Sequence, residues 1–141
     1  MTQPFEPGTY VIVNRVPCPT NETLAITYNG PDQPLTVNIR TDSSRQRWIV
    51  QDYRHIDIEN AKSLVPVDAT DFQAVWDADL VQTAQKYNFV WIIQRTNSGY
   101  TIQDDIGTAF WGAVDAVDNA PLVVGSDTGD EKHRWSFERV L

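Results

Sequence analysis

Few residues in this chain have the type and spacing that catalysis requires. The sequence contains two histidines, His55 and His133, and one cysteine, Cys18. None of them lies in a motif of a serine hydrolase, a zinc protease, a phosphate-binding loop or a dithiol oxidoreductase. His55 and Asp57 would share one face of a strand, but a zinc or iron site needs further ligands that the neighbouring sequence does not supply. We therefore expect no enzyme activity, no metal site and no cofactor.

The loops instead contain residues that could bind a partner. Asn29-Gly30, between two β-type runs, is the strongest short-range signal for a hairpin turn and needs no partner to explain it. Pro31 and Pro34 nevertheless stiffen a loop longer than a minimal hairpin needs, which favours a surface presented to a partner. Both interpretations of this loop stay open on the residues alone.

Composition limits the partners. The chain has 141 residues and a net charge of −8, so it should repel the phosphates of nucleic acids and anionic lipids. No apolar stretch approaches the roughly 18–20 residues needed to cross a bilayer. One cysteine excludes an intramolecular disulfide, and the first residues lack the basic start and apolar run of a secretory signal. We expect a cytoplasmic monomer of one domain, with no nucleic-acid and no membrane partner.

Internal repeats decide the predicted fold. Three aromatic-centred strand segments recur, and their tryptophans, Trp48, Trp91 and Trp135, lie 43 and 44 residues apart. A leucine precedes each tryptophan by 13, 11 and 13 residues in turn: Leu35, Leu80 and Leu122. Because each tryptophan recurs at one strand position, we expect all three to be core residues. Opening strands are marked at Gly8–Ile12 and Gly99–Ile102, with a weaker counterpart at His55–Ile58.

Each repeat has room for four short strands, read as runs rich in Val, Ile, Thr and aromatic residues between turn formers. We predict an all-β β-trefoil, with twelve short strands in three four-stranded repeats of about 8–54, 55–96 and 97–141 and pseudo-threefold symmetry. Six strands would form a barrel that three hairpins close at one end. The strands expected in the first and third repeats are 8–14, 24–29, 34–40 and 47–53, then 99–104, 109–114, 121–125 and 133–139.

The middle repeat is less regular. Within residues 70–86, Phe72, Val75, Trp76 and Leu80 have helical spacing, so an amphipathic helix fits the local pattern. The register of the repeats requires strands in the same segment. We predict strands.

Strand phrases along the chain resemble the mushroom β-trefoil inhibitors of the cospin and cnispin type. The matching phrases are GTYVIVN, LAITYNGPDQPLTV, RQRWIVQDY, GYTIQDD and GDEKHRWSFERV. This resemblance implies inhibition of a trypsin-like serine protease by a rigid loop that mimics a substrate. The reactive residue of that type matches Asn29, within a loop of Tyr28, Asn29, Gly30 and Pro31.

Two cations compete with Asn29 for the protease pocket. A trypsin-like specificity pocket is acidic, so it should prefer a positive charge to a neutral amide. Arg15 lies in a proline-stiffened first loop, and Lys132 lies in the last long loop, where the cnispin type is understood to use a lysine.

Other β-trefoils supply two further alternatives. In ricin-B-like lectins a repeat can bind sugar through an aspartate, an aromatic platform and an asparagine. In the third repeat, Asp104, Trp111 and Asn119 have suitable types and order, while Gln46-Arg47-Trp48 is the literal Q-x-W segment of such lectins. Inhibition of cysteine proteases, as in the mycocypins, is the last alternative.

Overall fold

The structure, a computed structural model, describes residues 6–41, 43–52, 61–85 and 89–140. Two short 3-10 turns, η1 (Ser44–Gln46) and η2 (Glu131–His133), interrupt the strands, and no helix in these ranges is long and apolar enough to cross a lipid bilayer. The strands are β1 (Gly8–Asn14), β2 (Leu24–Thr27), β3 (Thr36–Ile39), β4 (Trp48–Asp52), β5 (Ala61–Pro66), β6 (Phe72–Asp77), β7 (Leu80–Gln85), β8 (Trp91–Thr96), β9 (Gly99–Gln103), β10 (Phe110–Ala113), β11 (Ala120–Gly125) and β12 (Trp135–Arg139).

Six strands, the first and the fourth of each repeat, form a closed barrel. Antiparallel pairs join β1 to β4, β4 to β5, β5 to β8, β8 to β9 and β9 to β12. The pairing of β12 with β1 completes the ring. A closed ring leaves no strand edge unpaired along the barrel.

Three hairpins, β2–β3, β6–β7 and β10–β11, cap one end of the barrel. They meet through their backbones: the Leu35 N–H donates to the Val81 carbonyl over 2.8 Å, and the Leu122 N–H donates to the Leu35 carbonyl over 3.1 Å. This barrel with three hairpins is the predicted β-trefoil.

Each repeat ties its hairpin to the barrel in the same way. The indole N–H groups of Trp48, Trp91 and Trp135 donate to hairpin carbonyls over 3.0, 2.8 and 3.1 Å. The acceptors are Ile26, Ala74 and Trp111, respectively. All three donor side chains are fully buried, which confirms that they are core residues.

The middle repeat is made of strands, as predicted, but its markers shift. Val81 is buried and takes the place that Leu35 and Leu122 hold in the other hairpins, while Leu80 is half-buried. The opening strand of this repeat is β5, Ala61–Pro66. The marker expected at His55–Ile58 lies outside the described residues.

Candidate functional site

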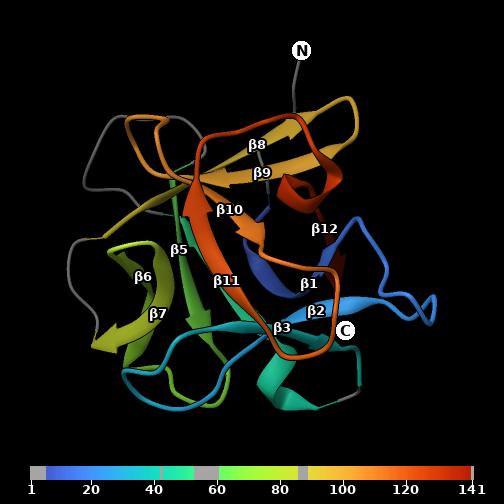
Figure 1. Cartoon of the computed structure of the whole chain (residues 1–141). Helices are drawn as coiled ribbons and strands as arrows, with labels where there is room; N and C mark the ends of the chain where they lie inside the picture. Colours follow the sequence, from blue (N-terminus) through green and yellow to red (C-terminus); the bar gives the residue numbers. More distant parts are fainter. Residues whose placement is uncertain (1–5, 42, 53–60, 86–88, 141) are drawn as a thin grey trace.

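A polar groove of about 450 Å³ lies beside β3 and opens to solvent. Strands β2 and β3, the turn η1 and the loop between β10 and β11 surround it, and Figure 1 shows that loop beside β3 and η1. We call it the β3 groove, and its polar walls are Asn29, Asn38, Thr41, Arg45, Asp118 and Asn119.

The buried amide of Gln46 frames the floor of the β3 groove. Its Nε2 donates to the Thr27 hydroxyl over 3.2 Å and to the Ile39 carbonyl over 3.1 Å. Its Oε1 accepts the backbone N–H of Thr41 over 2.7 Å. One side chain thus holds two strands and the following turn at fixed distances, so the glutamine of the Q-x-W segment has a structural role here.

Asn29 forms part of one wall, and its amide is engaged within its own loop. Nδ2 donates to the Pro34 carbonyl over 3.0 Å and to the Thr36 hydroxyl over 2.9 Å. Oδ1 accepts from Nη2 of Arg45 over 3.2 Å, and the same guanidinium donates from Nε to the Tyr28 carbonyl over 3.1 Å. Asn29 therefore braces the loop that the protease-inhibitor interpretation would present to a protease.

The neighbours of Asn29 differ in exposure. Tyr28 is buried in the core, whereas Pro31 is exposed. Gly30 has a φ of 115°, which favours glycine, and its carbonyl accepts the Thr83 hydroxyl over 2.9 Å. The loop is held to the neighbouring β6–β7 hairpin at this point.

The third repeat supplies the opposite wall. Oδ1 of Asp118 accepts the backbone N–H of Ile39 over 2.8 Å, and the backbone N–H of Asn119 donates to the Val37 carbonyl over 2.8 Å. Nδ2 of Asn38 lies 3.4 Å from Oδ1 of Asn119. The groove is therefore an interface between the first and third repeats.

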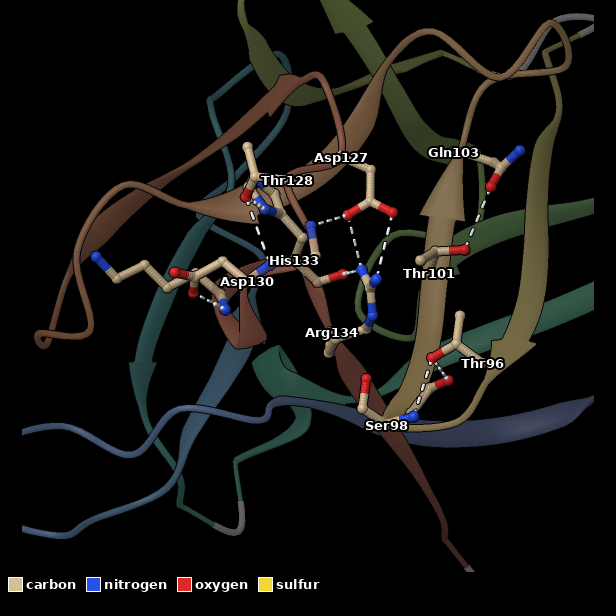
Figure 2. Close-up of polar contacts among 12 residues, drawn as sticks. Thr96, Ser98, Thr101, Gln103, Asp127, Thr128, Asp130, His133 and Arg134 are labelled. Atoms are coloured by element: carbon tan, nitrogen blue, oxygen red, sulfur yellow. Dashed lines mark hydrogen bonds and ion pairs between the residues drawn. The ribbon is translucent and has the colours of Figure 1, made fainter.

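The equivalent place in the third repeat is filled. His133 stands where Gln46 stands in the first repeat, and it covers Gly112 so closely that a Cβ atom there would lie 2.4 Å from Cδ2 of the imidazole. Oγ1 of Thr128 lies 3.3 Å from Nδ1 of the same ring (Figure 2). The absence of a side chain at Gly112 leaves room for the Cδ2–Nε2 edge of the imidazole against the hairpin.

An ion pair fixes the loop before η2. Nη1 and Nη2 of Arg134 donate to the two carboxylate oxygens of Asp127 over 2.9 and 3.3 Å, as Figure 2 shows. The hydrogen bond from Arg134, which outweighs the opposing effect of burial, holds the pKa of Asp127 below its usual value. The Arg134 side chain is nearly buried, so the pair is shielded from water on that side.

The trio predicted for sugar binding does not converge. Trp111 is 1% exposed and packs edge-on against Trp91, with ring centroids 5.0 Å apart, so its face is not available to a sugar. Asp104 is buried and accepts from Thr108 and from the backbone of Ala109. Asn119 contacts β3 instead, because the loop that carries it packs against the first repeat.

Burial alone would raise the pKa of Asp104. Hydrogen bonds from the Thr108 hydroxyl and from the backbone N–H groups of Ala109, Thr108 and Gly107 outweigh it, so the pKa lies below its usual value. Asp104 therefore stays charged and closes its own turn.

The two cations proposed for a protease pocket lie in adjacent loops. The backbone N–H of Arg15 donates to the Arg134 carbonyl over 3.0 Å, and Nδ2 of Asn14 donates to the Lys132 carbonyl over 2.9 Å. The Arg15 residue is exposed and Lys132 is half-buried.

Metal ligands do not gather in the part of the chain that the structure describes, where no three residues among His, Cys, Asp and Glu form a metal-binding group. His55 and Asp57 lie outside that part.

Trp76 is the residue that sequence reasoning missed. It is the last residue but one of β6 and is 36% exposed, which is unusual for tryptophan on a packed hairpin. The two-residue turn that follows carries Ala78 at a φ of 53°, between the exposed carboxylates of Asp77 and Asp79. The helical spacing of Trp76 with other apolar residues suggested a buried position. The Asp-Ala-Asp segment that directly follows it nevertheless indicates a turn, and so the tip of a hairpin.

Comparison with known structures supports the fold. The chain resembles a mosquitocidal holotoxin with a TM-score of 0.84 and 14% identity, covering 97% of this chain but 18% of the holotoxin. The Rhizoctonia solani agglutinin matches with a TM-score of 0.77 and 12% identity, over 99% of this chain and all of the agglutinin. A Macrolepiota procera ricin B-like lectin, solved with lactose, matches with a TM-score of 0.75 and 15% identity over 99% and 100%.

A search among curated proteins found no significant match. The family model described as CCL2 lectin-like matches residues 8–135, which extend from the first barrel strand to the core tryptophan of the last. The chain therefore belongs to the CCL2 lectin-like family.

Proposed function

We propose that this protein is a lectin, a binding protein without catalytic activity, and that Trp76 is the platform on which a sugar ring stacks. The family match over 8–135 supports the class of function. The single observation that carries the location is the exposed indole at the tip of the β6–β7 hairpin.

The surroundings of Trp76 suit a rigid platform. The residue is 36% exposed, so most of the side chain is packed while one part faces solvent. An aromatic ring that is already fixed loses little conformational freedom when a ligand docks, and its face attracts the C–H groups of a sugar. A half-packed indole thus binds more tightly than a freely rotating one would.

Asp77 and Asp79 supply hydrogen-bond acceptors beside the indole. Both residues are exposed, and the pairing of Asp77 with Leu80 fixes the turn that carries them. Sugar hydroxyl groups donate to ionised carboxylates in strong, charge-assisted hydrogen bonds. An apolar ring with flanking acceptors is the mixed surface that a saccharide needs.

The protease-inhibitor hypotheses have weaker support. The β-trefoil is common to both interpretations, whereas the matching family model describes lectins. Both amide atoms of Asn29 bond within the chain, so the side chain would have to break these contacts before it entered a protease pocket. Inhibition of trypsin-like or cysteine proteases is therefore the alternative result that the experiment below must distinguish from sugar binding.

Glycan-array screening followed by calorimetry with the strongest hit, with lactose as a first soluble probe, tests the proposal. We expect Trp76→Ala to weaken binding at least tenfold, because an aromatic anchor that the bound ligand covers contributes about 2 kcal/mol or more. Ile106→Ala removes an apolar side chain that is 75% exposed elsewhere and serves as the matched control. Equal affinity of both variants, or stoichiometric inhibition of trypsin or papain without any glycan signal, would contradict the proposal.

A further inference from the structure

We infer that the β3 groove is a second saccharide site, separate from Trp76, that takes an uncharged sugar by its neighbouring hydroxyl groups. The inference rests on the proposed lectin function, but it concerns other repeats and other chemistry. Trp76 belongs to the middle repeat, whereas the groove is formed by the first and third repeats.

The groove combines unused donors with an unused acceptor. Within the described ranges, Nη1 of Arg45, Nδ2 of Asn119 and Oδ2 of Asp118 have no hydrogen-bond partner, while the other atoms of the same groups are bonded to the fold. A sugar hydroxyl both donates and accepts. Neighbouring hydroxyls could therefore satisfy the Asp118 acceptor and both donors, Asn119 and Arg45, at the same time.

The charges in the groove select an uncharged ligand. Arg45 and Asp118 carry opposite charges on walls of the same groove, so a carboxylate or phosphate drawn to Arg45 would be repelled by Asp118. The remaining polar lining is made of neutral amides and hydroxyls, such as Asn38 and Thr41. These groups fit a polyol better than an anion.

The side chains that line the groove favour a polar ligand over a mainly apolar one. Ile39 is the only hydrocarbon side chain among the described residues that line the groove. Small-molecule sites usually have volumes of about 300–1,000 Å³ and are mostly apolar. At about 450 Å³ the β3 groove has room for a small saccharide, but its walls would bind the hydroxyl edge and not stack on the ring.

The groove is built before any ligand arrives. Gln46, 3% exposed, holds β2, β3 and η1 together, and Asp118 fixes the opposite wall through the N–H of Ile39. Binding to groups that are already positioned costs little conformational entropy. In the third repeat, His133 fills the equivalent space, so these two repeats differ in what they can hold.

Two-dimensional ¹⁵N–¹H NMR titration of the full chain tests the inference. The probes are neutral lactose, maltose, N-acetyllactosamine and methyl α-mannoside, with sodium glucuronate as the acidic counterpart. We expect at least one neutral probe, and not glucuronate, to shift the amide signals of Ile39, Asn38 and Asn119. The same shifts should persist in Trp76→Ala.

Asn119→Gly is the variant that removes a donor from the groove. Asn119 has a φ of 68°, which glycine adopts without strain, so the backbone should be unchanged. Loss of one hydrogen bond should weaken groove binding by a factor of about 3–10. Asn97→Gly makes the same change in the exposed turn between β8 and β9 and should leave affinity unchanged.

The two proposals fail in different ways. If neutral sugars shift only the signals around Trp76, the groove inference is overturned and the lectin proposal stands. Shifts in the groove that Asn119→Gly does not weaken also overturn the inference. If the groove responds and Trp76→Ala changes nothing anywhere, the groove stands and the Trp76 site is wrong. No shift with any of these probes, together with no signal on the glycan array, overturns both.

Discussion

Gln46 and His133 occupy the same position in two repeats, two residues before the core tryptophans Trp48 and Trp135, and each lies next to a threonine five residues earlier. The Thr41 hydroxyl is 3.4 Å from Oε1 of Gln46, and that of Thr128 is 3.3 Å from Nδ1 of His133. The glutamine leaves an open groove, whereas the imidazole fills the space over Gly112. The side chain at this position is thus one difference between the open first repeat and the filled third repeat.

Gly112→Ala should destabilise the protein by about 1–3 kcal/mol, because the new Cβ would lie 2.4 Å from the His133 ring and must displace it. Urea unfolding measures the change. Gly125→Ala is the control, since nothing lies within 4 Å of its Cβ position. In a His133→Ala background the cost should disappear; an undiminished cost would mean that the ring is not the obstacle.

Gln46→Ala should cost about 2–3 kcal/mol, because it leaves the buried hydroxyl of Thr27, the N–H of Thr41 and the carbonyl of Ile39 without their partner. The free energy of unfolding in urea is the measurement. Gln51→Ala, on the exposed end of β4, should change stability by less than about 0.5 kcal/mol. Similar values for both variants would show that Gln46 does not hold β2, β3 and η1 together.

Acid should weaken the fold as Asp127 and Asp104 become protonated. Both pKa values lie below the ordinary 3.8, so the unfolded chain binds protons more readily than the folded one. Their stabilisation is therefore complete above about pH 5 and is lost as the pH falls through 3.8 and then through the lower, folded pKa values. Thermal unfolding between pH 7 and pH 2 checks the direction.

Asp127→Asn should remove part of that pH dependence. At neutral pH it should cost about 1.5–3 kcal/mol, because the nearly buried Arg134 loses its charged partner. Asp105→Asn, next to Asp104 but exposed, is the control. An acid response in the Asp127 variant as steep as in the parent would contradict the assignment.

Ala78→Gly should stabilise the protein by about 1 kcal/mol. Alanine at a φ of 53° places its Cβ too close to the backbone, and glycine relieves this strain. Ala84→Gly, within β7, should instead destabilise by about 0.5–1 kcal/mol. Calorimetric melting of the two variants should move in opposite directions, and a shared direction would argue against strain at the turn.

Positions that recur once in each repeat could be predicted from the sequence. Trp48, Trp91 and Trp135 recur because each must reach a hairpin carbonyl from the same barrel position, and this constraint preserves their type and spacing. Leu80 was the wrong equivalent of Leu35 and Leu122, because the next residue, Val81, occupies that position in the middle repeat. The β6–β7 hairpin turns through two residues, 78–79, whereas residues 28–35 and 114–119 connect the strands of the other two hairpins.

The sites were harder to predict, because they join segments that are distant in sequence. Order along one repeat suggested that Asp104, Trp111 and Asn119 would meet, yet Asn119 contacts Asn38 of another repeat. Spacing also does not show which tryptophan is covered by neighbours. Trp111 and Trp76 both lie on hairpins, but contacts from the rest of the fold bury one and leave the other partly exposed.

The first and last strands of the barrel are partners, from Tyr10 opposite Arg139 to Asn14 opposite Trp135. Nη1 of Arg139 also reaches Oε2 of Glu6 over 3.1 Å. A circular permutant, joined there by a short linker and opened at the exposed Asn97 turn, would keep every strand pair, and exposed turns of this kind usually tolerate such cuts. The barrel fixes which strand lies beside which, and the order of the repeats along the chain is a matter of connectivity alone.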